Sequence, residues 1–147
     1  MMEILGPKRD NKSVGERSQA IILARLSEVG YNVLIPFGEN HRYDLVIEDA
    51  DRQFWRIQCK TGCISNGCID FNTSSNYYHH LRKGGRTDYR RRDYRGQIDY
   101  FAVYSPDTKK VYLVPIDHVP STEGRLRLEP TKNHQEKNVR WAKDYEL

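Results

Sequence analysis

The fold of this chain is decided by residues 43–61, which read YDLVIEDADRQFWRIQCKT. Two runs within this stretch, 43–48 and 54–61, alternate apolar with polar side chains, and the five residues between them are mostly polar. Alternation with a period of two is typical of a half-buried strand, and a short polar connection suits a turn. The stretch therefore predicts a β-hairpin.

The predicted hairpin carries polar groups of three different chemistries. Because successive side chains of a strand point to opposite faces, Asp44 shares a face with Val46, and Gln58 shares a face with Lys60. Ile57 then points the other way, into a core. A carboxylate, an amide and an ammonium are thus expected on two neighbouring strands.

Further elements are expected on both sides of this hairpin. A broad apolar face with helix-forming residues, closed by a glycine, predicts an amphipathic helix over 13–30. The tyrosine-rich and arginine-rich stretch 77–96 has no clean periodicity, and we expect a loop with a short helix there. The remaining predicted strands, the last two forming a second hairpin, are 31–36, 67–73, 99–105 and 111–119.

Length and composition bound the kind of protein. The 147 residues suit a single α/β domain over 1–147, with a core at about 13–119 and a polar C-terminal extension over 120–147. A hydrophobic fraction of 37% and a charged fraction of 30% indicate a small core. No run approaches the roughly 18 apolar residues of a membrane span, and an odd number of cysteines fits a reducing compartment. We therefore expect a cytoplasmic protein with no membrane partner.

Positive charge is concentrated between residues 82 and 95. This stretch holds seven basic and two acidic residues, a net +5, whereas the whole chain carries +4, so the rest carries −1. A basic block in an otherwise neutral protein is expected of a surface that meets a polyanion, and interleaved tyrosines add flat faces for sugars or bases. The predicted DNA-contacting residues are Arg82, Lys83, Arg86, Arg90, Arg91, Arg92, Arg95, Tyr77, Tyr78, Tyr89 and Tyr94. The alternative is a solvated charged loop.

Four positions carry the candidate chemistry. Asp44 and Gln58 offer oxygen ligands, and Glu16 adds a second carboxylate from the start of the predicted helix. Hard oxygen donors of this kind suit Mg²⁺ or Mn²⁺. Lys60, on the same strand face as Gln58, can reach a phosphate oxygen or an attacking water. A metal that activates water and a cation that meets developing charge are what phosphodiester hydrolysis needs.

The order of these residues resembles the PD-(D/E)xK nuclease signature. Asp44, then 13 residues, then Gln58-Cys59-Lys60 matches it, with Gln in the second acidic position and Tyr43 in the place of Pro. The succession GE, GYNVLIP, YDLVIE, WRIQCKT and IDYFAVYS is similar to the branch that includes group I intron-encoded homing endonucleases. Archaeal Holliday junction resolvases share the same helix Glu, strand Asp and strand Lys.

The resemblance implies a restriction-endonuclease-like core, in which a mixed central β-sheet is flanked by helices. It also implies a Mg²⁺-dependent or Mn²⁺-dependent endonuclease of double-stranded DNA, of the site-specific homing type. Because 147 residues offer limited surface with which to read a long site, we expect a homodimer or homotetramer. Lys60 would assist the attacking water. The metal ligands that it implies are Glu16, Asp44, Gln58 and the carbonyl of Cys59. Because Gln58 brings no charge, metal binding is expected to depend on the phosphate of the DNA.

Several alternatives compete with this interpretation. Ser13 and Glu16 have the spacing of a capping box, in which Glu16 would only satisfy the start of its own helix. The adjacent His79 and His80 could act as a general base or contact phosphate, and Arg42 is expected in a surface loop. The competing functions are a structure-selective junction resolvase and a catalytically silent nucleic-acid-binding module.

Overall fold

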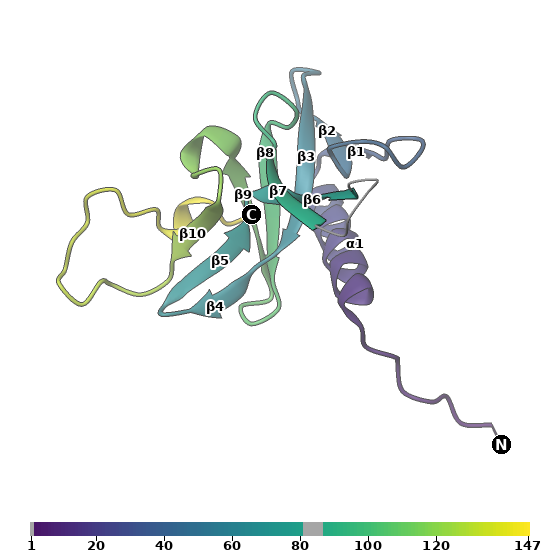
Figure 1. Cartoon of the computed structure of the whole chain (residues 1–147), viewed down its shortest axis with the longest axis horizontal. Helices are drawn as coiled ribbons and strands as arrows, with labels where there is room; N and C mark the ends of the chain where they lie inside the picture. The colour runs from purple at the N-terminus through teal and green to yellow at the C-terminus, as the bar shows by residue number, and fades with distance from the viewer. Residues whose placement is uncertain (1, 81–86) are drawn as a thin grey trace.

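The computed structural model describes the backbone of residues 2–80 and 87–147 and, within these ranges, all side chains except those of 77–80 and 87–90. The described elements are arranged in layers. One helix covers one face of a five-stranded sheet, and a three-stranded sheet packs against the other face (Figure 1).

Helix α1 (Asn11–Val29) confirms the predicted helix but begins two residues earlier. Its N-cap is Asp10, whose carboxylate accepts the N–H of Ser13 at 2.8 Å, and it ends at Gly30, whose φ of 114° suits a residue without a Cβ. Since Ser13 is therefore the third helical residue, Glu16 lies beyond the capping positions, and the capping-box alternative is wrong. No helix in the described ranges is both long and apolar enough to cross a membrane.

The central sheet is mixed, as expected. Its strands, in spatial order, are β1 (Asn32–Leu34), β2 (Leu45–Glu48), β3 (Phe54–Thr61), β8 (Tyr100–Ser105) and β9 (Lys110–Pro115). β3 and β8 run parallel, and the other neighbours are antiparallel. Both predicted hairpins, β2–β3 and β8–β9, are therefore confirmed.

Apolar side chains of the central sheet fill two cores, one on each face. Leu45 and Ile57 are fully buried and pack with Ile22 of α1. On the opposite face, Phe101 packs with Leu126 of the second sheet. The polar residues that alternate with Leu45 and Ile57 therefore face away from α1.

The second sheet consists of β10 (Glu123–Arg127), β5 (Cys68–Asn72) and β4 (Cys63–Ser65), in that order. β5 confirms the strand predicted over 67–73, whereas β10 was not expected within the polar C-terminal extension. Gly124 allows β10 to lie on the core, because a Cβ at this position would come within 2.3 Å of the Phe71 ring. Two short 3-10 helices, η1 (Ile116–His118) and η2 (Ala142–Asp144), complete the described elements.

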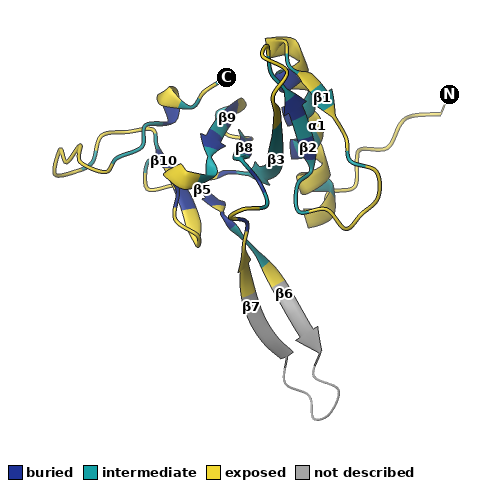
Figure 2. Ribbon diagram, turned by 90° about the horizontal axis from the view of Figure 1, so that it is seen from above, coloured by how far each residue is buried: buried dark blue, intermediate teal, exposed yellow. Residues whose placement is uncertain are grey.

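The segment expected to be a loop with a short helix contains an antiparallel pair of strands instead. β6 (Ser74–His80) pairs with β7 (Thr87–Asp93), and Tyr77 lies opposite Arg90 in the register. The two strands pair only with each other, and where they can be followed in Figure 2 they lead away from both sheets. Neither face has to be apolar in such a ribbon, which explains why the sequence shows no period of two.

Candidate active site

Asp44 lies immediately before β2 and is held against β3 by two hydrogen bonds. Its backbone N–H donates to the Ile57 carbonyl at 2.8 Å, and its carboxylate Oδ2 accepts the backbone N–H of Cys59 at 2.9 Å. Burial raises the pKa of this half-buried carboxyl, while the Cys59 N–H and the charge of Lys60 oppose the shift. Asp44 is therefore a positioned carboxylate whose charged form a bound cation would stabilise.

Lys60 extends from β3 on the face of the sheet opposite α1. Its Nζ lies 3.4 Å from the hydroxyl oxygen of Tyr94 and 5.0 Å from the centre of the Tyr94 ring. Tyr94 belongs to the core that lies between the central and second sheets. The Asp44 carboxylate accepts the N–H of Cys59, the residue next to Lys60, and the positive charge of Lys60 opposes part of the upward shift of the Asp44 pKa.

Gln58 and Cys59 lie between these two charged groups along β3. Gln58 is half-buried and shares its strand face with Lys60. The N–H and C=O of a strand residue point toward the same neighbouring strand, so the Cys59 carbonyl faces the side on which its N–H bonds Asp44. The Cys59 thiol packs on the α1 side instead, and burial raises its pKa, so it stays protonated at neutral pH. Cys59 can thus offer a main-chain oxygen but no thiolate.

Glu16 is exposed on α1. The Oγ of Ser18 lies 2.6 Å from the Oγ1 of Thr61 at the end of β3. Gln19, one turn beyond Glu16, lines a hollow of about 160 Å³ together with Asp44. The first half of α1 therefore lies beside the site, but no hydrogen bond or ion pair within the described ranges links Glu16 to the other predicted ligands.

The oxygen donors of the site fit a divalent cation such as Mg²⁺ or Mn²⁺. A carboxylate, an amide oxygen and a main-chain carbonyl are hard ligands of the kind that these ions bind. Among residues 2–80 and 87–147, no three His, Cys, Asp or Glu side chains gather as a metal cage. An ion bound here would therefore need water or a substrate phosphate to complete its coordination.

Arg42, two residues before Asp44, anchors the β6–β7 ribbon at its root, where β6 begins at Ser74 and β7 ends at Asp93. Its guanidinium donates to the Oγ of Ser75 at 2.7 Å, to the carbonyl of Asp93 at 3.1 Å and to the Oε1 of Gln97. It also lies 4.1 Å from the centre of the Tyr94 ring. Arg42 lies in the loop between β1 and β2, as expected, but its planar fork of donors is occupied by contacts within the protein.

Tyr94 does not lie on the DNA-facing surface that we predicted for it. Only 4% of the residue is exposed, and its ring packs edge-to-face on Phe101 with 5.8 Å between centroids. The prediction of DNA contact is wrong for Tyr94, because its ring is part of the core and its hydroxyl meets Lys60. The available signal was its position just before Ile98, where the apolar pattern resumes after the basic run.

The other predicted DNA-contacting residues differ in how far the structure describes them. Those with exposed side chains, all near the root of the ribbon, are Arg91, Arg92 and Arg95. Those on β6 or β7 whose side chains are outside the description are Tyr77, Tyr78, Tyr89 and Arg90. Those that lie outside the described residues are Arg82, Lys83 and Arg86. The basic side chains that can be placed therefore lie next to the Arg42 anchor.

Comparison with known proteins bears on the family and the fold. A family model described as PD-(D/E)XK endonuclease matches residues 9–147. A solved structure of a bacterial homing endonuclease, I-Ssp6803I, is similar with a TM-score of 0.70 and 23% identity, over 94% of this chain and 89% of that chain. No curated protein matches. The α/β fold with a mixed sheet is confirmed by this likeness, and because the family match spans nearly the whole chain, this protein belongs to the PD-(D/E)XK endonuclease family.

Proposed function

We propose that this protein is a divalent-metal-dependent endonuclease that hydrolyses phosphodiester bonds in double-stranded DNA. Membership of an endonuclease family indicates nuclease activity. The observation that carries the finer proposal is the Asp44 carboxylate, which accepts the N–H of Cys59 at 2.9 Å and is thereby fixed beside the strand residue that precedes Lys60. The root of a basic ribbon lies beside it, attached through Arg42.

The proposed roles follow from the chemistry of each group. Asp44, Gln58 and the Cys59 carbonyl, with Glu16 from α1, would hold Mg²⁺ or Mn²⁺. Such an ion, when bound, lowers the pKa of a water molecule and stabilises charge on the leaving oxygen. Lys60 orients that water or meets the developing negative charge, and the Tyr94 hydroxyl restricts where its Nζ can lie.

The proposed substrate is a specific site in duplex DNA. I-Ssp6803I, which shares the fold, is described as a homing endonuclease, and this supports a homing-type role for the present chain. Exposed arginines at the root of the ribbon supply phosphate contacts. A chain of 147 residues has limited surface with which to read a long site, so we propose a homodimer or homotetramer whose two sites cut the two strands.

Cleavage of mixed-sequence supercoiled plasmid tests the chemistry directly. Wild-type protein should nick or linearise the plasmid in Mg²⁺ or Mn²⁺ and lose this activity in EDTA. Lys60→Ala should remove most of the cleavage while leaving DNA binding intact, and Lys109→Ala, in the exposed β8–β9 turn, is the matched control. Metal-independent cleavage, or equal cleavage by the Lys60 variant, would refute the proposal.

One observation favours a catalytically silent nucleic-acid-binding module instead. Gln58 is neutral, and the described residues form no carboxylate cage. Such a module would bind duplex DNA with strong salt dependence but would cut nothing in either metal.

Competition between a four-way junction and a long duplex of varied sequence distinguishes the homing role from that of a junction resolvase, since a resolvase would prefer the junction whatever its sequence.

A further inference from the structure

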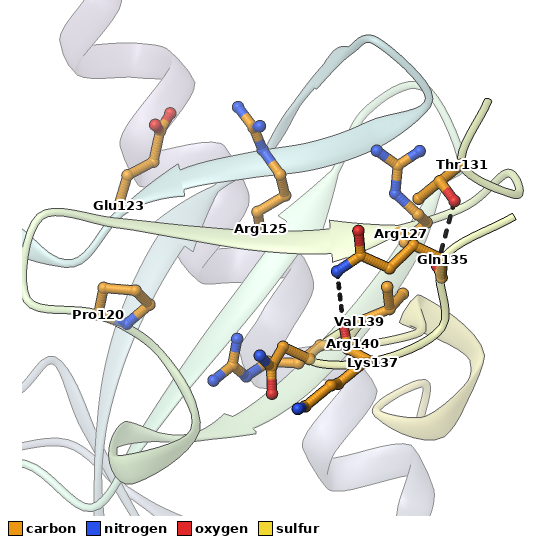
Figure 3. A pocket seen from close by; sticks show the side chains of 10 residues that line it. Pro120, Glu123, Arg125, Arg127, Thr131, Gln135, Lys137, Val139 and Arg140 are labelled. Atoms are coloured by element: carbon orange, nitrogen blue, oxygen red, sulfur yellow. Dashed lines mark hydrogen bonds between the residues drawn. The ribbon is translucent and has the colours of Figure 1, made fainter. Parts of the chain in front are cut away.

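A basic hollow lies on the outer face of the second sheet, between β10 and the C-terminal segment (Figure 3). We call it the β10 hollow, and its volume is about 370 Å³. Leu126 is fully buried, so its neighbours Arg125 and Arg127 point outward and line the hollow. Lys137 and Arg140 line it from the C-terminal segment. Basic side chains therefore come from two separate walls.

The β10 hollow remains positive after its internal ion pairs are counted. Arg125 bonds the carboxylate of Asp70 at 2.7 and 3.1 Å, so this pair contributes little net charge. Glu123 is the one carboxylate among the lining residues. Of the cations that line the hollow, three form no ion pair with any residue that the structure describes: Arg127, Lys137 and Arg140. A solvated hollow with this balance attracts an anion rather than a cation.

The β10 hollow adjoins the root of the ribbon. β10 pairs with β5 so that Glu123 lies opposite Asn72, two residues before β6 begins. Thr73, the residue between the end of β5 and the start of β6, donates from its Oγ1 to the carbonyl of Pro120 at 2.6 Å, and Pro120 lines the hollow. A polyanion bound along the ribbon root would therefore meet the β10 hollow on the adjacent surface.

We propose that the β10 hollow is a second DNA contact, which binds backbone phosphates of the duplex away from the cleaved bond. The inference rests on the proposed function, because it takes the same DNA as its ligand. Arg127 of β10, with Lys137 and Arg140 of the C-terminal segment, supplies the positive charge for these phosphates from two walls of the hollow. Guanidinium groups bind phosphate oxygens in pairs, so the contact adds affinity but reads no bases.

The test compares the salt dependence of binding in variants that each lack one positive charge. Binding of a duplex of ~40 bp would be measured by fluorescence anisotropy in EDTA over a series of salt concentrations. Arg140→Gln should weaken binding and reduce the slope of log K against log salt by up to about 0.9, the contribution of one neutralised phosphate. Lys109→Gln, exposed in the β8–β9 turn, should leave the slope unchanged. Cleavage at saturating DNA should be the same in both variants.

A second variant keeps the test decisive if the first one is unstable. If Arg140→Gln unfolds at a lower temperature, Lys137→Gln takes its place, because Lys137 is exposed and lines the same hollow. Equal slopes for the hollow variants and Lys109→Gln would mean that no phosphate binds there. A change in oligomeric state on size-exclusion chromatography, with an unchanged slope, would assign the hollow to contact between copies of the chain. Failure of wild-type protein to bind any duplex would refute the proposed function itself, so the two failures are distinguishable.

Discussion

The hairpin β2–β3 and the ribbon β6–β7 are both antiparallel pairs, yet they differ in what surrounds them. β2–β3 has β1 and β8 at its edges and α1 on one face, whereas β6–β7 pairs only with itself. The first is fixed by a core and can hold catalytic groups in register. The second has no sheet neighbour to fix it and carries exposed arginines at its root. Rigidity and charge, the requirements of chemistry and of phosphate binding, are thus divided between two regions.

Arg42 and Tyr94 join the two regions. Arg42 bonds Ser75 and the Asp93 carbonyl at the ribbon root and lies over the Tyr94 ring, while the hydroxyl of Tyr94 meets Lys60. A displacement of the ribbon would therefore be transmitted to the neighbourhood of Lys60. Substitutions in the hairpin should change rate, those in the ribbon should change affinity, and those at the junction should change both.

The largest expected effect is that of Asp44→Ala on cleavage. Removal of a proposed metal ligand should lower the cleavage rate by about 100-fold to 1,000-fold, as expected when several kcal/mol of transition-state stabilisation are removed. DNA affinity should stay near that of the wild type, because the proposed phosphate contacts lie elsewhere. Single-turnover cleavage and anisotropy would be measured on the same DNA. A rate equal to that of the wild type would remove Asp44 from the catalytic centre.

Arg42→Ala should produce the next largest effect and lower both rate and affinity. A hydrogen bond to a charged group typically contributes about 1.5–3 kcal/mol, and removal of one such contribution corresponds to a decrease of roughly 10-fold to 100-fold in kcat/KM. Arg42→Lys keeps the charge but cannot form the same fork of bonds, so it should rescue little. If Arg42→Ala changes affinity alone, the ribbon is not coupled to Lys60.

Replacement of both Arg91 and Arg92 by Ala should change affinity only. The bonds that Arg42 makes to this strand end on main-chain carbonyls, so they survive the substitutions. The slope of log K against log salt should fall by about 0.9 for each phosphate that is no longer neutralised. For two phosphates, the loss of affinity between 50 and 200 mM salt should be smaller than that of the wild type by a factor on the order of 10. The rate at saturating DNA should stay unchanged. A reduced rate under those conditions would contradict the division between the two regions.

The amino-acid sequence predicts the two hairpins of the central sheet, which face a core, and fails for the β6–β7 ribbon, which pairs with no other strand. Residues 54–61 alternate because Ile57 packs on α1 while Lys60 faces the other layer, and this burial made the hairpin and its polar face recognisable. β6 and β7 pair only with each other, so no such pattern identified them. The contacts of Arg42 and the burial of Tyr94 were not foreseen for a related reason. The partners of Arg42 lie 33 to 55 positions away along the chain, and Lys60 lies 34 positions from Tyr94. A local sequence pattern does not report such contacts.

Tyr94→Phe should have a small effect that is confined to the hairpin side. The ring stays in the core and beneath Arg42, so the free energy of unfolding should change by less than about 1.5 kcal/mol. Without the hydroxyl, Nζ of Lys60 loses a partner at 3.4 Å, and kcat should fall by less than about 10-fold while KM is unchanged. Tyr94→Leu removes the ring as well and should lower affinity too. An increase in KM for Tyr94→Phe would show that its hydroxyl contacts DNA.

The smallest expected effect is a gain in stability from a second substitution of Asp44, the residue whose change to Ala should lower the cleavage rate most. Burial raises the pKa of Asp44 in the folded chain, so the unfolded chain loses this proton first as pH rises. The free energy of unfolding therefore falls as pH rises from the ordinary Asp range through the raised pKa, and it remains lowered at neutral pH. Asp44→Asn cannot ionise, and its amide oxygen can still accept the Cys59 N–H.

This variant should consequently have a higher Tm than the wild type at neutral pH in EDTA, and the difference should disappear in acid. Added Mg²⁺ should raise the Tm of the wild type and not that of the variant, because an ion that binds only the folded state stabilises it. A Tm for Asp44→Asn that is lower at neutral pH would mean that the carboxylate is stabilised without metal. The Asp44 charge would then lower the stability of the free protein while cleavage requires it, as expected of a metal ligand beside the rigid hairpin. An exposed arginine of the ribbon should show no such conflict between stability and activity.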